Sequence, residues 1–119
     1  MALGGIFTLT QQSGETQKAV DNDHSLEVLA DRCAHVCRTS NQIGTVALIK
    51  PASGTYFYAR SGRVCYRMGE RVRCHPVECN VTPGVFLNLT SDIAEQTYTT
   101  HEFRCSIERD ENITIGCQG

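Results

Sequence analysis

The clearest periodic pattern in this chain is a run of apolar residues between Ser25 and Arg38. Its apolar positions recur at three- and four-residue spacing, as on the buried face of an α-helix, and are Leu26, Leu29, Ala30, Cys33, Val36 and Cys37. Asp23 or Ser25 has a side chain suited to cap the start of this helix. The preceding polar stretch, residues 11–23, predicts a loop or a weak helix. We expect the regular helix to end within residues 38–41.

Several apolar segments predict strands along the remaining chain. Residues 5–10 alternate between apolar and polar, and the segments 45–50, 55–60 and 84–89 also have the composition of strands. Two of them flank the Pro-Ala-Ser-Gly sequence at 51–54, which predicts a hairpin with a four-residue loop. Residues 91–96 predict a loop or a short helix, and residues 98–103 lead into a last hairpin.

The segment 64–74 predicts a hairpin whose register follows from its turn. A two-residue turn at Gly69 and Glu70, with glycine first, pairs Cys65 with Cys74 across the strands. Counting outward from the turn places this pair at a non-hydrogen-bonded position, where the two side chains are close enough to form a disulfide. We therefore expect a Cys65–Cys74 bond.

The C-terminal segment predicts a second hairpin by the same reasoning. A three-residue loop at 110–112 pairs Ile107 with Ile115 and Cys105 with Cys117. We expect a second cross-strand disulfide here, with the asparagine at the end of the loop exposed.

The order of these elements is one strand, one helix and about six further strands. This order predicts an α+β fold in which one amphipathic helix packs on an antiparallel β-sheet of about five to seven strands. A chain of 119 residues supports one hydrophobic core, so residues 1–119 are expected to form a single disulfide-stabilised domain.

Cysteine and asparagine usage indicate a secreted, extracellular protein. The chain has seven cysteines and no tryptophan, and small secreted domains commonly use disulfides to support a thin core. Three of its five asparagines begin an Asn-X-Thr sequon for N-glycosylation, namely Asn80, Asn88 and Asn112. No segment approaches the roughly 20 apolar residues of a membrane-spanning helix, so no membrane span is expected.

Three cysteines remain after the two hairpins are assigned: Cys33, Cys37 and Cys79. Cys79 can join the helix through Cys33 or Cys37, and the helical cysteines could equally reach Cys105 or Cys117. Because the count is odd, we expect any disulfide-linked association with another chain to use the cysteine left over. The alternative is a zinc site formed by Cys33, Cys37, Cys74 and Cys79 with His75 as a substitute ligand, but the sequons favour disulfides, so no metal or cofactor is expected.

Charge is concentrated in the hairpin at 64–74 although the formal net charge is only −2. Five arginines and a single acid, Glu70, occupy residues 60–73, and the candidate partner-binding residues are Arg60, Arg63, Tyr66, Arg67, Arg71 and Arg73. This pattern predicts binding to an extracellular protein or an anionic glycan, and the overall acidity argues against nucleic acid. Alternatively, the arginines only protect an edge hairpin from aggregation, or are neutralised by the acids Asp21, Asp23, Glu27, Asp31, Glu108, Asp110 and Glu111.

These observations favour a small secreted binding protein, such as an effector, an inhibitor or a receptor fragment, over an enzyme. It would recognise a macromolecular partner through its loops and its arginine-rich hairpin. The alternative is a secreted hydrolase of ribonuclease type. Its candidate acid–base residues are His75 with Glu78 and His101 with Glu102, aided by Arg73 or Arg104. His35 lies on the polar side of the helix and is expected to be solvated.

Overall fold

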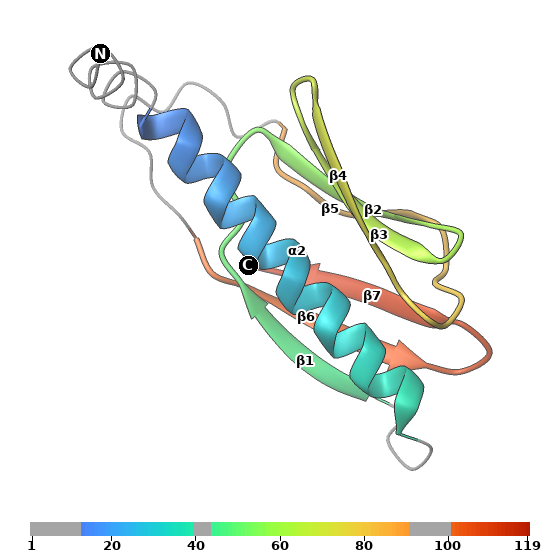
Figure 1. The fold of residues 1–119 in the computed structure, drawn as a ribbon. Coiled ribbons are helices and arrows are strands. Elements are labelled where there is room, and N and C mark those ends of the chain that lie inside the picture. Colours follow the sequence, from blue (N-terminus) through green and yellow to red (C-terminus); the bar gives the residue numbers. More distant parts are fainter. Residues whose placement is uncertain (1–12, 40–43, 91–100) are drawn as a thin grey trace, which may run out of the picture.

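The computed structural model describes residues 13–39, 44–90 and 101–119 of the chain. The described part has one long helix, α2 (Ser13–Arg38), and seven strands (Figure 1). The strands are β1 (Gly44–Ile49), β2 (Thr55–Arg60), β3 (Arg63–Met68), β4 (Arg71–Pro76), β5 (Gly84–Asn88), β6 (Phe103–Arg109) and β7 (Ile113–Gln118). The expected strand at 5–10 and the segment 91–96 lie outside the described residues.

Helix α2 begins at Ser13, well before the expected start near Ser25. The weak-helix interpretation of the polar stretch is therefore the correct one for its described part, and Asp23 and Ser25 are interior residues rather than caps. Polar contacts stabilise this N-terminal half: Gln17 donates a hydrogen bond to Asp21 one turn later, and Asn22 is fully buried. From Leu26 onward the predicted apolar face is confirmed, because its members are buried apart from the half-buried Cys37.

The strands form two antiparallel sheets that share the helix. One sheet has the order β1-β6-β7 and the other has the order β4-β3-β2-β5. Helix α2 packs on β1 and β6 of the first sheet and on β3 and β4 of the second, so it extends across both (Figure 1). The predicted α+β class is confirmed, with the strands divided between two sheets.

The expected hairpin joining residues 45–50 to 55–60 is wrong. Strand β1 pairs with β6, whereas β2 pairs with β3 and β5, so the two segments belong to different sheets. The connection between them is held beneath the helix, because Pro51 and Ala52 are buried and the backbone N–H of Ala52 donates a 2.9 Å hydrogen bond to the side chain of Asn22. This anchoring to a distant residue directs the chain from one sheet to the other.

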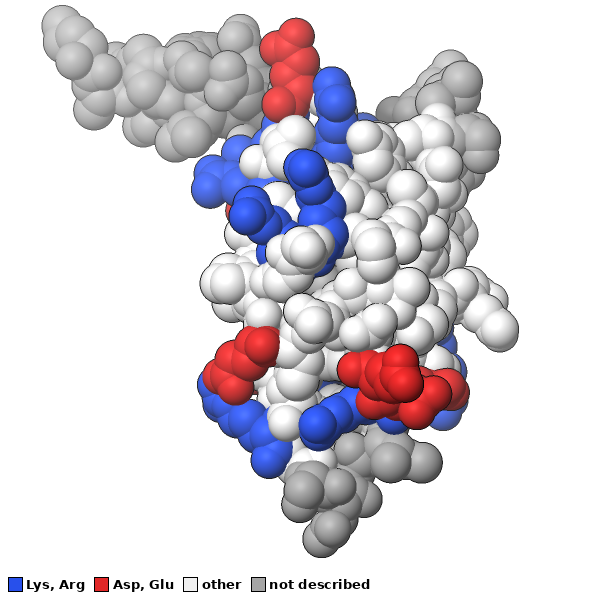
Figure 2. Space-filling view, turned by 90° about the vertical axis from the view of Figure 1, so that its right-hand side faces the viewer, with Lys and Arg blue, Asp and Glu red and all other residues white. Residues whose placement is uncertain are grey.

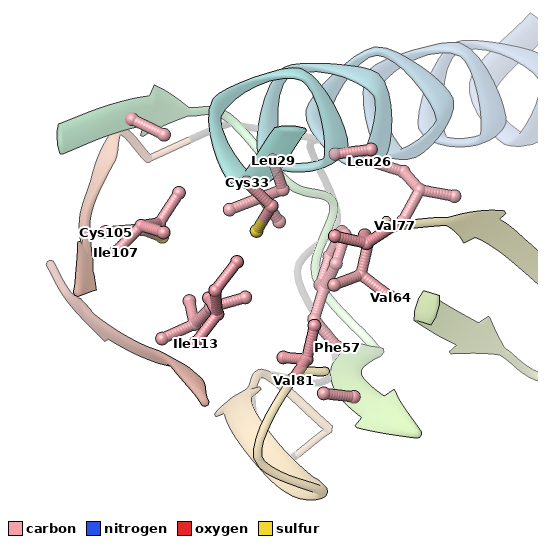
Figure 3. Packing of buried hydrophobic residues seen from close by; sticks show 14 of the residues in the cluster. Leu26, Leu29, Cys33, Phe57, Val64, Val77, Val81, Cys105, Ile107 and Ile113 are labelled. Atoms are coloured by element: carbon pink, nitrogen blue, oxygen red, sulfur yellow. The ribbon is translucent and has the colours of Figure 1, made fainter. Parts of the chain in front are cut away.

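The hydrophobic core lies between the helix and the two sheets. Figure 3 shows Leu26, Leu29 and Cys33 of the helix facing the core residues of the strands, among them Val64, Ile107 and Ile113. In the four-stranded sheet, the ring of Phe57 lies 5.5 Å from that of Tyr66 and 6.3 Å from that of Phe86, measured between centroids. Such tilted aromatic pairs add to the stabilisation that burial provides.

Three disulfides reinforce this core. Cys65–Cys74 and Cys105–Cys117 join the strand pairs that the hairpin registers predict. The third bond joins Cys37, in the last turn of the helix, to Cys79 in the connection between β4 and β5, 42 residues away. The zinc alternative is wrong, because three of its four cysteines are bonded in disulfides.

Cys33 is the cysteine left over, and its environment contradicts the expected role in covalent association. Its side chain is fully buried in the core, and burial raises the pKa of the thiol to about 12. A thiol in this position is neither accessible to a second chain nor deprotonated at neutral pH. It serves instead as a small apolar side chain of the core.

Candidate interaction surface

The arginine-rich hairpin of β3 and β4 has two faces with different surroundings. Gly69 has a φ of 62° at the first turn position, and the strands pair Cys65 with Cys74 as predicted. Side chains alternate along each strand, so neighbouring residues point to opposite sides of the sheet. The six residues expected to bind a partner are therefore divided: Tyr66, Arg71 and Arg73 lie on the helix side, and Arg60, Arg63 and Arg67 lie on the opposite side.

On the helix side, Tyr66 and Arg71 are engaged with Asp23. The buried Tyr66 donates a hydrogen bond from its hydroxyl to the Asp23 carboxylate, and Arg71 contacts the other carboxylate oxygen at 3.0 Å. Arg71 also donates a 2.9 Å hydrogen bond to the Tyr66 hydroxyl. Burial, and then the hydrogen bond to Asp23, raise the pKa of Tyr66. Tyr66 and Arg71 therefore attach the hairpin to the helix, and their contacts are internal to the domain.

The opposite side is the solvent-facing surface of the four-stranded sheet, which we call the outer face. Each of the four strands contributes side chains to it, and the register places there Tyr56, Tyr58, Arg60, Arg63, Arg67, Val72, Val85 and Asn88, together with the Cys65–Cys74 disulfide. Val72 and Val85 are 47% and 56% exposed. The outer face thus combines aromatic, aliphatic and guanidinium groups on a rigid, disulfide-linked surface.

The two tyrosines of β2 were not among the predicted site residues. Tyr56 and Tyr58 are half-buried, and their ring centroids lie 5.6 Å apart on the outer face. The alternation of β2 was a signal for them, because it places both tyrosines on the same side as Arg60. Their position beside Arg67 depends on the pairing of β2 with β3, which sequence reasoning did not predict.

The outer face carries positive charge without acidic side chains. Its members include three arginines and no aspartate or glutamate. The ion pairs found among the described residues lie elsewhere, between Arg38 and Glu78 and between Arg71 and Asp23. In Figure 2, basic side chains gather over the upper part of the surface, with an acidic side chain at their upper edge, and much of the surface beside them is uncharged. Arginines that lie outside these ion pairs, beside tyrosines, are a composition typical of the centre of protein interfaces.

The candidate acid–base residues are distributed over two places. His75 and Glu78 line a cavity of about 600 Å³ between the helix and β4, together with His24, Glu27 and Asp31. The Nη2 of Arg38 donates a 2.6 Å hydrogen bond to the Oε1 of Glu78, and this hydrogen bond lowers the pKa of the Glu78 carboxyl group. His101 and Glu102 are exposed just before β6 and are not part of this cavity. Within the described ranges, no three histidine, cysteine or acidic side chains are grouped closely enough to hold a metal ion.

The three sequon asparagines are all exposed. Asn88 lies on the outer face opposite Tyr56, and its side-chain oxygen accepts hydrogen bonds from both the backbone and the hydroxyl of Thr90. Asn80 and Asn112 lie on neighbouring segments away from the outer face. His35 is exposed, as predicted.

Comparisons with known proteins give no relative: no protein-family model, curated protein or solved structure matches this chain. Among the described residues, no helix has the length and apolar character needed to cross a bilayer. The three disulfides are compatible with an extracellular protein.

Proposed function

We propose that this protein is a secreted binding protein whose outer face recognises an acidic segment of a partner protein. The observation that carries the proposal is the absence of acidic side chains among the outer-face residues, which include Arg60, Arg63 and Arg67. Carboxylates of a partner would give these guanidinium groups charge-assisted, bidentate hydrogen bonds. Arg63 and Arg67 point the same way on β3, with Cys65 between them, so they can contact one partner segment together.

The uncharged part of the outer face favours a protein over a sulfated glycan as the partner. Tyr58 and Cys74 lie in the row between Arg67 and Arg63, and Val72 lies beside Arg67 on the edge strand. Val72 and Cys74 are exposed and Tyr58 is half-buried, so together they offer an apolar surface, whereas Cys65 is buried. A partner with apolar side chains can cover this surface and gain from its desolvation, whereas a sulfated sugar chain has few apolar groups to place there. An acidic segment with an embedded apolar residue satisfies both parts of the surface.

The proposal also makes the Asn88 sequon informative. A glycan on Asn88 would lie beside Tyr56, at the β5 side of the outer face, and leave β3 and β4 free. We therefore place the main contacts on Arg63, Arg67 and Val72. Secretion is part of the proposal and is supported by the three disulfides and the three exposed sequons.

A peptide-display selection tests the proposal without a known partner. The full protein, expressed with its disulfides, is used to select from a random peptide library, and each selected peptide is then synthesised and titrated. We expect enriched peptides to carry aspartate or glutamate beside an apolar residue. The Arg63→Glu/Arg67→Glu variant should weaken their binding by about tenfold or more, because it replaces attraction with repulsion at two positions.

Arg104→Glu is the matched control, because Arg104 is an exposed arginine on β6 of the other sheet. It changes net charge in the same direction and should leave the titrations nearly unchanged. Selected peptides without acidic residues, or equal weakening by both variants, would overturn the proposal. Retention on heparin that depends on Arg63 and Arg67, with no acidic peptide selected, would instead assign the outer face to an anionic glycan.

A further inference from the structure

Two of the three sequons lie side by side in the folded protein. Val81, the middle residue of Asn80-Val81-Thr82, forms a parallel β-bridge with Ile113, the middle residue of Asn112-Ile113-Thr114. The backbone N–H of Ile113 donates a 2.8 Å hydrogen bond to the carbonyl of Asn80, and the N–H of Thr82 donates a 2.7 Å hydrogen bond to the carbonyl of Ile113. The two sequons are thus in register.

The bridge separates the side chains of each sequon into an inner and an outer set. Val81 is 4% exposed and Ile113 is fully buried, so both middle residues belong to the core. The asparagines and threonines on either side are exposed, and the hydroxyls of Thr82 and Thr114 lie 3.2 Å apart. Asn80 and Asn112 therefore project from adjacent positions on one surface.

We propose that Asn80 and Asn112 form a paired N-glycosylation site, modified before the bridge closes and presenting two adjacent glycans once it has closed. The inference rests on the secretion assumed in the proposed function. In each transfer, the asparagine amide nitrogen bonds to the anomeric carbon of a lipid-diphosphate-linked oligosaccharide. The bond from that carbon to the diphosphate oxygen breaks, and the amide proton passes to a base of the transferase.

The folded arrangement opposes this transfer at both asparagines. A transferase must bind the sequon backbone and the threonine hydroxyl. In the folded protein, the backbone groups of the two sequons are already hydrogen-bonded to each other. The two threonine hydroxyls are in contact with each other as well. Modification of the folded protein therefore requires local opening that removes Val81 and Ile113 from the core. Opening one sequon exposes the other, so their reactivities are coupled.

Coupled modification of Asn80 and Asn112 can be distinguished experimentally from independent modification of the two sequons. Unglycosylated, oxidised protein is incubated with eukaryotic microsomal oligosaccharyltransferase and lipid-linked donor, and site occupancy is measured by peptide mass spectrometry. The native chain should be modified at Asn80 and Asn112 about tenfold or more slowly than the reduced, carboxymethylated chain. Ile113→Ala keeps both sequons and should raise the native rate at Asn112 and, equally, at Asn80.

Val64→Ala is the matched control, because Val64 is a fully buried aliphatic residue of the other sheet. It should leave the native rates at Asn80 and Asn112 unchanged, and Ile113→Val serves as the milder variant if Ile113→Ala fails to fold. A rate increase at Asn112 alone, or equal rates for native and unfolded chains, would overturn the pairing.

In secreted protein from mammalian cells, the Asn88→Gln variant should include molecules that carry two glycans. Their complete absence would show that Asn80 and Asn112 are not a paired acceptor site. None of these measurements involves partner binding, so failure of the paired site and failure of the outer face as a binding surface are distinguishable.

Discussion

The side-chain amide of Asn22 donates a 2.9 Å hydrogen bond to the hydroxyl of Thr55, although the two residues are 33 positions apart. Both side chains are buried. The same amide contacts the sulfur of Met68, and its oxygen accepts the N–H of Ala52. One helical asparagine thus joins the helix to the start of β2 and to the connection that separates the two sheets.

Asn22→Ala should destabilise the protein by about 2 kcal/mol or more, because it leaves the buried Ala52 N–H and Thr55 hydroxyl without their partner. Urea denaturation monitored by circular dichroism measures the change. Ser25→Ala is the control: the buried Ser25 hydroxyl has no hydrogen-bond partner among the described residues, so its removal should cost less than about 0.5 kcal/mol or be stabilising. A larger loss from Ser25→Ala than from Asn22→Ala would contradict this assignment.

Tyr66 and Arg71 should contribute to stability as a coupled pair. Tyr66→Phe and Arg71→Ala are each expected to cost about 1 kcal/mol, and the double variant should cost less than their sum because both side chains bind Asp23. Arg67→Ala, on the outer face, should change stability by less than about 0.5 kcal/mol. Additive costs for Tyr66→Phe and Arg71→Ala would show that the three groups do not act as one network.

Cys33 should make stability decrease at alkaline pH. The thiol has a pKa of about 12 in the folded protein and 9.0 in the absence of burial, so the unfolded chain loses this proton first as pH rises. The stability that the buried, protonated thiol contributes is fully present below pH 9.0. The free energy of unfolding then decreases as pH rises toward 12, by at most about 1.4 kcal/mol per pH unit. Urea midpoints measured across this window should fall less steeply for Cys33→Ala.

The same burial predicts that Cys33 is inert in the native protein. Iodoacetamide at pH 8 should label it only after denaturation without reductant, because the native thiol is inaccessible and protonated. Rapid labelling of the native protein would place the thiol outside the core.

The disulfides should differ in how much they stabilise the fold. Cys37–Cys79 closes a loop of 42 residues and Cys65–Cys74 a loop of 9. By loop-closure entropy, replacing the first pair with alanines should cost about 4 kcal/mol and replacing the second about 2.6 kcal/mol. Thermal or urea unfolding of the two double variants would measure the difference. The reverse order would mean that the Cys37–Cys79 connection is already restricted in the unfolded chain.

Local features of this protein could be determined from the sequence by itself. The registers that pair Cys65 with Cys74 and Cys105 with Cys117 follow from short turns, because the residues that specify each pairing are close together in the chain. The apolar face of the helix from Leu26 onward follows from a periodicity that burial requires. These predictions hold because the interactions behind them involve near neighbours.

Only the tertiary structure decided the features that depend on distant residues. The polar start of the helix carries little periodic signal, and Asn22 is buried there because Ala52 and Thr55 supply its hydrogen bonds. The division of β1 and β2 between two sheets depends on β6, far along the chain. Arg67 and Arg71 are on opposite faces of the hairpin because side chains alternate along a strand. That Arg71 is the one facing the helix is known only from its contact with Asp23 in the folded protein. Such choices depend on which distant surfaces are buried together, and a linear pattern does not contain that information.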